Sequence, residues 1–175
     1  MFLQDGNLVI RNATASDAKT LCTWWNDGRV MAHAGFPHGL FTSPQAIEKD
    51  LATDHDDVHH RLIFEIDSIP VGEMNYRNKG NHIAEIGIKI CDFNKQEKGY
   101  GTRFLRLLIG WLFREMGYHK IILDTNVNNT RAQHVYEKIG FKRVATRVGA
   151  FTDQLGELRS SIDYELTEDD LIPGQ

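Results

Sequence analysis

One short segment of the sequence has residue types that could bind a phosphate group: Gln96-Glu97-Lys98-Gly99-Tyr100-Gly101. It follows an apolar run at residues 86–91 and precedes a segment whose apolar residues recur with the period of a helix. A strand, a turn with two glycines and a helix start leave several backbone N–H groups unpaired, and these attract anions together with the helix dipole. The segment therefore predicts a pyrophosphate site, the alternative being a tight turn without a ligand.

Two common phosphate-binding motifs do not fit this segment. A P-loop requires Gly-x-x-x-x-Gly-Lys-Ser/Thr, and no such run occurs in the chain. The dinucleotide fingerprint Gly-x-Gly-x-x-Gly requires a third glycine, where this chain has Phe104. The pattern that fits is Gln/Arg-x-x-Gly-x-Gly/Ala, in which glycine lets a phosphate approach the backbone closely.

This pattern resembles the coenzyme-binding motif of the GNAT superfamily, the acetyl-CoA-dependent N-acetyltransferases. A second segment, NTRAQHVYEKIGF at residues 129–141, resembles the family pattern Asn-x-x-Ala-x-x-x-Tyr-x-x-x-Gly-Phe. Two motifs in this order and spacing are more specific than either one. The resemblance is sharp over residues 83–145, and the subgroup it most resembles contains ribosomal-protein and spermidine acetyltransferases. One departure is Phe93, which stands where many relatives have proline.

The resemblance implies that acetyl-CoA is the acyl donor and that the site contains no metal. Backbone N–H groups of the glycine turn would hold the pyrophosphate, and the main chain of the preceding strand would pair with the pantetheine arm. The residues implied in coenzyme binding are Ile88, Lys89, Ile90, Cys91, Gln96, Glu97, Lys98, Gly99, Tyr100, Gly101, Thr102, Asn129 and Lys138.

Four of these residues also have a simpler interpretation. Lys98 and Lys138 could be solvated surface lysines. Asn129 is of a type favoured as the N-cap of the helix that follows it. Cys91, one of only two cysteines, is most simply a small core residue.

Tyr136 matches the family tyrosine that lies near the thioester sulfur. A phenol at that place can donate a hydrogen bond, and then a proton, to the departing thiolate. The alternative is a core tyrosine, because Tyr136 lies on the apolar stripe of its expected helix.

Glu85 is the candidate general base, because it is an acidic residue inside an apolar strand, about where the family often keeps one. The acceptor must lose a proton, since a free alkylammonium has a pKa of about 10.4. A carboxylate could take that proton through a water molecule. The alternative is that Glu85 faces solvent on a half-exposed strand, and Glu73 on the neighbouring strand is the reserve candidate.

The acceptor is expected to bind near residues 24–60, the least regular part of the sequence. This part contains aromatic and acidic residues, which suit a cationic amine. They are Trp24, Trp25, His33, Phe36, His38, Phe41, Asp54, Asp56 and Asp57. For Trp24 and the three aspartates, we favour a core tryptophan and a solvated acidic loop.

Bulk properties narrow the class of protein. A chain of 175 residues suits one domain with its own core, and a net charge of −4 gives no basic surface for nucleic acid. No apolar stretch approaches the roughly 20 residues of a membrane span. The N-terminus lacks the pattern of a secretory signal, so we expect a cytoplasmic protein.

The order of expected elements predicts an α/β fold. We expect strands at residues 8–12, 61–66, 71–76, 82–91, 120–125, 141–147 and 158–166. We expect helices at 44–51 and 130–139, a helix that is capped by Ser16 or Asp17 and runs to about Trp25, and a long helix that follows the glycine turn and ends at Gly117. This order predicts a mixed, mostly antiparallel sheet of six to seven strands flanked by about four helices, which matches the GNAT fold. We expect the whole chain, 1–175, to form one domain, with a loose acidic tail at 167–175.

Three functions fit these observations. The first is an N-acetyltransferase that moves an acetyl group from acetyl-CoA to a primary amine of a small molecule or a protein, by direct attack in a ternary complex. The second is a non-catalytic acyl-CoA-binding or regulatory module on the same fold. The third is a domain that binds another phosphate ligand at Gly99 and Gly101. The expected partner is the amine acceptor, with a homodimer as a further option.

Overall fold

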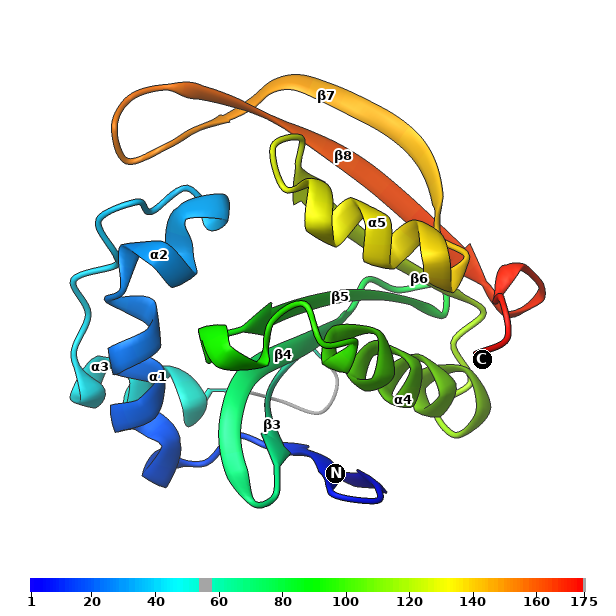
Figure 1. The fold of residues 1–175 in the computed structure, drawn as a ribbon, viewed down its shortest axis with the longest axis horizontal. Helices are drawn as coiled ribbons and strands as arrows, with labels where there is room; N and C mark the ends of the chain where they lie inside the picture. Colours follow the sequence, from blue (N-terminus) through cyan, green and yellow to red (C-terminus); the bar gives the residue numbers. More distant parts are fainter. Residues whose placement is uncertain (54–57, 175) are drawn as a thin grey trace.

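The computed structural model describes residues 1–53 and 58–174. In this part of the chain, eight strands form one sheet in the order β1-β2-β3-β4-β5-β6-β8-β7 (Figure 1). Neighbouring strands are antiparallel except β5 and β6, which are parallel. The mixed, mostly antiparallel sheet is therefore confirmed, although the described residues form more strands than the six to seven expected.

The strands are β1 (Phe2–Asp5), β2 (Leu8–Asn12), β3 (His59–Ile66), β4 (Ile69–Asn78), β5 (Ile83–Ile90), β6 (Lys120–Asn126), β7 (Lys142–Thr152) and β8 (Leu158–Thr167). The α-helices in the described residues are α1 (Ala18–Trp25), α2 (Gly28–Met31), α3 (Pro44–Leu51), α4 (Tyr100–Arg114) and α5 (Thr130–Ile139). Short 3-10 helices are η1 (Ala15–Asp17), η2 (Ala32–Ala34), η3 (Phe93–Lys95) and η4 (Glu168–Asp170).

Two elements were missed by the sequence prediction, β1 and α2. The residues of β1 are mostly exposed, so this edge strand lacks the alternation of apolar and polar residues that reveals a half-buried strand. The four residues of α2 are too few to show a helical period. A local hydrogen bond begins this helix, because the Asp27 side chain accepts from the N–H of Arg29 at 2.8 Å.

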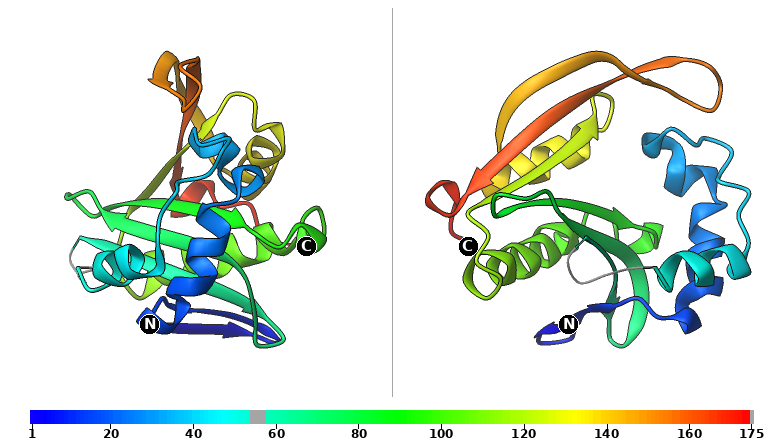
Figure 2. Two further views of the ribbon diagram at one scale, coloured as in Figure 1. Left: turned by 90° about the vertical axis from the view of Figure 1, so that its left-hand side faces the viewer. Right: turned by 180° about the vertical axis from the view of Figure 1, so that it is seen from behind.

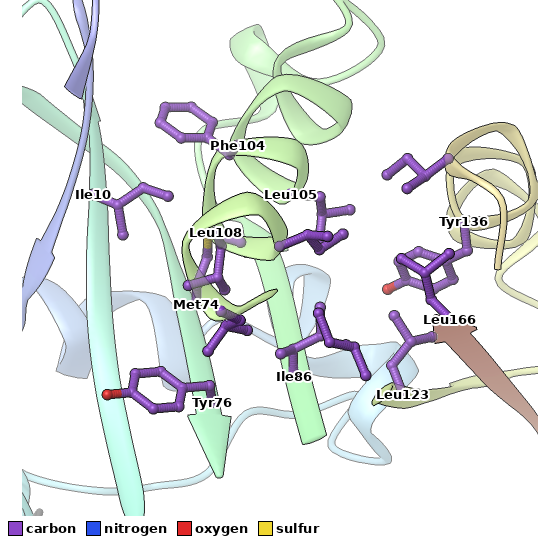
Figure 3. Packing of buried hydrophobic residues seen from close by; sticks show 14 of the residues in the cluster. Ile10, Met74, Tyr76, Ile86, Phe104, Leu105, Leu108, Leu123, Tyr136 and Leu166 are labelled. Carbon is purple, nitrogen blue, oxygen red and sulfur yellow. The ribbon is translucent and has the colours of Figure 1, made fainter. Parts of the chain in front are cut away.

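The larger core lies between one face of the sheet and the helices α4 and α5. Phe104 of α4 packs against Phe64 of β3, with ring centroids 4.4 Å apart. Leu105 and Leu108 project from α4 toward β4 and β5, while Tyr136 projects from α5 beside Leu123 (Figure 3). The stripe on α4 forms because residues three and four apart share one face of a helix. The buried face fixes the position of α4, and therefore the position of the glycine turn that precedes it.

A smaller core lies on the opposite face of the sheet. Ile63 of β3 points away from its neighbours in the larger core and packs with Leu21 and Trp25 of α1 and with Ile47 of α3. Ser43 caps α3 as predicted, since its hydroxyl accepts from the N–H of Ala46 at 3.2 Å. This second core holds the N-terminal helices against the sheet, beside the open end of β5 (Figure 2).

The parallel pair β5 and β6 separates after a short contact. Their pairing runs from Ile83↔Lys120 to Glu85↔Ile122, whereas β5 continues to Ile90 and β6 to Asn126. Among the described residues, 86–90 therefore have no strand partner on the edge that faces β6. A backbone edge of this kind can pair with an extended ligand as if it were another strand.

The acidic tail, expected to be loose, makes defined contacts as far as it is described. The N–H of Ile172 donates to the carbonyl of Ile139 at 2.8 Å, and Asp170 pairs with Lys142. Gly140 permits this approach: a Cβ there would lie 2.1 Å from the Asp170 carbonyl oxygen. Within residues 1–53 and 58–174, no helix is long and apolar enough to cross a membrane.

Candidate active site

A cleft of about 620 Å3 lies where β5 and β6 separate. Residues of β5 and β6 line its floor, and the glycine turn, α5, α2 and the β7–β8 hairpin line its sides. Its size is within the range of small-molecule and cofactor sites, which are usually concave and partly apolar. The cleft brings together both sequence motifs, although they are separated by the whole of α4.

The glycine turn has the geometry of an anion site. Gly99 is the N-cap of α4 with a φ of 79°, and Glu97 also has a positive φ, 58°. The first hydrogen bond of the helix runs from the N–H of Arg103 to the Gly99 carbonyl at 3.2 Å. The N–H groups of residues 100–102 therefore precede the first hydrogen bond of the helix, and Gly99, Gly101 and Thr102 of this helix start line the cleft.

Gln96 connects this turn to two other elements. Its side-chain amide donates to the Ile90 carbonyl at the end of β5 at 2.9 Å, and its side-chain oxygen accepts from Arg131 at the start of α5. Asn129 caps α5, because its side chain accepts from the N–H of Ala132 at 3.3 Å, and it also lines the cleft. The capping interpretation of Asn129 is thus confirmed, and the cleft position is compatible with the second role.

Tyr136 lies on the side of the cleft formed by α5. Its ring packs edge-on against Phe141 and Tyr164, with centroid distances of 5.8 and 5.7 Å. The residue is only 6% exposed, and its hydroxyl, which makes no hydrogen bond to a described residue, points from α5 into the space beside Ile86 and Leu105 (Figure 3). Burial raises the pKa of the Tyr136 phenol above its usual range, and the Asp124 carboxylate adds to the shift.

Glu85 lines the same cleft from β5 and is partly exposed. Its carboxylate lies 3.6 Å from Lys79 and 3.9 Å from Arg77, distances that leave both oxygens available to water. The reserve candidate, Glu73, is buried, bonds to Lys89 at 3.0 Å and is absent from the residues that line the cleft. The structure therefore favours Glu85 over Glu73 as the group that could meet an acceptor.

The other predicted coenzyme residues divide into two groups. Ile88, Lys89, Ile90, Glu97 and Gly99 line the cleft with the residues named above. Cys91, Lys98, Tyr100 and Lys138 do not line it. Cys91 is buried, which raises the pKa of its thiol above the usual range, with Glu73 adding to the shift.

The residues that line the cleft coincide only in part with the region predicted for the acceptor. Of the aromatic residues named there, His33 lines the cleft, whereas Trp24 and Trp25 belong to the smaller core. Desolvation and the nearby charge of Arg131 lower the pKa of His33, so its imidazole is neutral at pH 7. The residues Asp54, Asp56 and Asp57 lie outside the part of the chain that the structure describes.

Several cleft residues were not predicted from the sequence. They are Arg29, Val30, Ala34, Asn75, Ile86, Gly87, Leu105, Asp124, Thr125, Asn126, Arg131, Ala132, Val135, Arg147, Ala150, Phe151 and Ser161. Arg131 lies inside the second motif, so its charge beside Asn129 was a usable signal. The pairing of Asn126 with Ser161 across β6 and β8 depends on the strand order, which the sequence does not show. No group of three metal-ligating side chains occurs among the described residues.

Comparisons with known proteins identify the family of the chain. The family model described as "Acetyltransferase (GNAT) domain" matches residues 7–142. An uncharacterized N-acetyltransferase of Bacillus subtilis, YnaD, is 27% identical over 146 residues, which are 82% of this chain and 84% of the relative. The spermidine N(1)-acetyltransferase of Vibrio cholerae is 30% identical over 93 residues, about half of each protein (50% and 51%).

Solved structures show the same fold. A GNAT-family acetyltransferase from Bacillus anthracis superposes with a TM-score of 0.80 at 25% identity, covering 97% of this chain and 99% of that one. The spermidine N-acetyltransferase of Vibrio cholerae, solved with CoA and spermine, gives a TM-score of 0.84 at 22% identity, covering 95% and 98%. Because the family model matches most of its length, the chain belongs to the GNAT family of acetyl-CoA-dependent N-acetyltransferases.

Proposed function

We propose that this enzyme transfers the acetyl group of acetyl-CoA to a primary amine by direct attack, with both substrates bound in one ternary complex. The observation that carries the proposal is that Glu85 and Tyr136 line one cleft, from β5 and α5, beside the glycine turn. Such a cleft can hold a donor and an acceptor together, and reactants held in contact react at high effective molarity.

Donor binding would use main-chain groups of three elements. The N–H groups of residues 97–102 would hold the pyrophosphate, with the Thr102 hydroxyl beside them. The unpaired edge of residues 88–90 would hydrogen-bond the pantetheine amides as an added strand. Gln96 would keep both parts in register, since it bonds to Ile90 and Arg131.

The chemical step would move two protons. Glu85, acting through water, takes a proton from the ammonium, and the free amine attacks the thioester carbonyl. The new N–C bond forms and the C–S bond breaks as the tetrahedral intermediate collapses. The nitrogen then loses its second proton, through water, to the Tyr136 phenolate that forms when Tyr136 protonates the thiolate. Tyr136 donates its hydroxyl proton to the departing thiolate; its raised pKa keeps the phenol protonated at neutral pH, as a proton donor requires.

The relatives indicate which acceptors to test first. Relatives of the chain include spermidine N(1)-acetyltransferases and a kanamycin resistance protein of Rhizobium radiobacter, 43% identical over 64 residues. Polyamines and amino sugars are therefore the first acceptors to test, together with peptides that carry a free N-terminus or a lysine.

The test is release of CoA thiol from acetyl-CoA in the presence of each amine, with the acetylated product identified by mass spectrometry. Amine-dependent thiol release with a stoichiometric N-acetyl product supports the proposal. Tight binding of acetyl-CoA without transfer to any amine would instead indicate a non-catalytic acyl-CoA-binding module. Failure to bind acetyl-CoA would refute donor recognition at the glycine turn.

A further inference from the structure

The amine end of the cleft lies between two segments that are far apart in the sequence. Residues Arg29, Val30 and His33 of α2 and η2 line one side, and Ala150 and Phe151 near the end of β7 line the other. Figure 2 shows the β7–β8 hairpin arching toward the loop that follows η2. The two segments meet beyond the cleft, at the tip of the hairpin.

Gln154 joins these segments with its backbone and with both ends of its side chain. Its N–H donates to the Gly35 carbonyl at 2.8 Å. Its side-chain oxygen accepts from the N–H of His38 at 2.8 Å, and its side-chain amide donates to the Gly39 carbonyl at 2.9 Å. We call this set of three hydrogen bonds the Gln154 clasp.

The hairpin side of the clasp is held in place by Asp153. One oxygen of this buried carboxylate accepts from the N–H groups of Leu155 and Glu157 at 2.9 and 3.0 Å, and the other accepts from Arg159 at 2.7 Å. The hydrogen bond from Arg159 lowers the pKa of Asp153, so the turn keeps these bonds at neutral pH. Gln154 is therefore presented by a turn with a defined shape.

The loop side of the clasp is closely packed. A Cβ at Gly39 would lie 2.2 Å from the Asn26 carbonyl oxygen, and a Cβ at Gly35 would lie 3.0 Å from the ring of Phe151. Both glycines have positive φ values, 81° and 98°. The loop therefore has little freedom to move away from the hairpin without breaking the clasp.

With the clasp in place, a closed ring of contacts surrounds the amine end. β5 pairs with β6, β6 with β8 and β8 with β7. The clasp connects the hairpin to the loop after η2. The guanidinium of Arg29 in α2 stacks over the ring of Phe93, 4.8 Å from its centroid, and Phe93 lies in η3, just after the end of β5. An acceptor that enters between α2 and the β7–β8 hairpin passes through this ring.

We infer that the Gln154 clasp determines acceptor specificity by admitting only slender, unbranched amine chains to the cleft. This inference rests on the proposed function. The cleft of about 620 Å3 has to hold the end of the donor arm together with the acceptor, and the ring of contacts bounds the acceptor's side of it, so the ring favours a narrow chain over a fused or multi-ring amine. Gln154 is a positioning residue, because it acts through the walls that it holds together.

The test compares linear alkyl mono- and diamines with kanamycin as a multi-ring amine, using the full-length enzyme and saturating acetyl-CoA. For the wild type, we expect kcat/KM for the best linear amine to exceed that for kanamycin by about a hundredfold or more. In Gln154→Ala we expect this ratio to fall by about tenfold, as KM for the linear amine rises, with acetyl-CoA affinity unchanged. Leu155→Ala, on the same turn but with an exposed side chain, is the matched control.

Equal use of kanamycin and linear amines by the wild type would overturn the inference while leaving the proposed function intact. A selectivity ratio unchanged in Gln154→Ala would overturn it as well. Gln154→Glu keeps an oxygen to accept from His38 but cannot donate to Gly39, so it serves as the milder variant if the alanine variant does not fold. Absence of transfer to every amine would refute the proposed function itself, and the role of the clasp with it.

Discussion

The guanidinium of Arg131 donates a hydrogen bond to the side-chain oxygen of Gln96, 35 residues earlier in the chain. The same Gln96 side chain donates to the carbonyl of Ile90. One amide group, that of Gln96 at the start of the glycine turn, thus joins the first turn of α5 to the end of β5. Both motifs that identify the family contribute a residue to this connection.

Loss of this connection should weaken donor binding. In Arg131→Ala, we expect the affinity for CoA to fall about tenfold, because a charge-assisted hydrogen bond that orders the loop is removed. Isothermal titration calorimetry measures the change. Arg114→Ala, at the exposed end of α4 and away from the cleft, should bind CoA like the wild type. Unchanged affinity in Arg131→Ala would show that the loop is ordered without this bond.

Removal of the Tyr136 hydroxyl should affect the chemical step alone. The ring of Tyr136→Phe can still pack against Phe141 and Tyr164, so we expect little change in stability or CoA affinity. Turnover should fall by about tenfold or more, since the thiolate would leave without a proton donor. Tyr164→Phe is the control, because that hydroxyl bonds to Glu137 and does not line the cleft. Wild-type turnover in Tyr136→Phe would remove the residue from the mechanism.

A base at Glu85 should leave a signature in the pH dependence of the rate. The wild-type rate should fall on the acidic side as the base is protonated, and Glu85→Gln should lower kcat by about a hundredfold and lose that acidic limb. Glu73→Gln should retain the limb, because Glu73 is buried against Lys89 outside the cleft. The measurement is kcat as a function of pH. A Glu85→Gln profile that coincides with the wild type contradicts the assignment.

The two cysteines should differ in reactivity. Burial raises the pKa of the Cys91 thiol, and the thiolate is the reactive form, so iodoacetamide should modify the partly exposed Cys22 first. Above a pH of about 8.5, the Cys91 thiol loses its proton in the unfolded chain but keeps it in the folded protein. The free energy of unfolding therefore falls as the pH rises above this value. Mass spectrometry of the native protein at pH 8 checks the order of labelling. Rapid labelling of Cys91 in the folded state would show that it is accessible.

The sequence predicted the parts of the fold that have strong local patterns. The apolar stripe of α4, the Ser43 and Asn129 caps and the stop of α5 at Gly140 all depend on residues close together in the chain. The parallel arrangement of β5 and β6 followed from the helix between them. The glycine turn and Tyr136 could be placed together because the two motifs have a known order in the family.

The acceptor side could not be predicted in the same way. The contact of Gln154 with Gly39 joins residues 115 positions apart, and no periodicity or motif marks either one. Asp124, Asn126 and Ser161 meet because β8 is inserted between β6 and β7, an order that local patterns do not reveal. β1 and α2 were missed because one is exposed and the other is short.

The most direct test of this account is a crystal structure of the enzyme with acetyl-CoA. The account predicts that the pyrophosphate oxygens lie within hydrogen-bonding distance of the backbone N–H groups of residues 97–102. It also predicts that the thioester sulfur lies beside the Tyr136 hydroxyl, with the pantetheine arm along residues 88–90 of β5. A coenzyme whose pyrophosphate rests elsewhere on the chain would contradict the central claim.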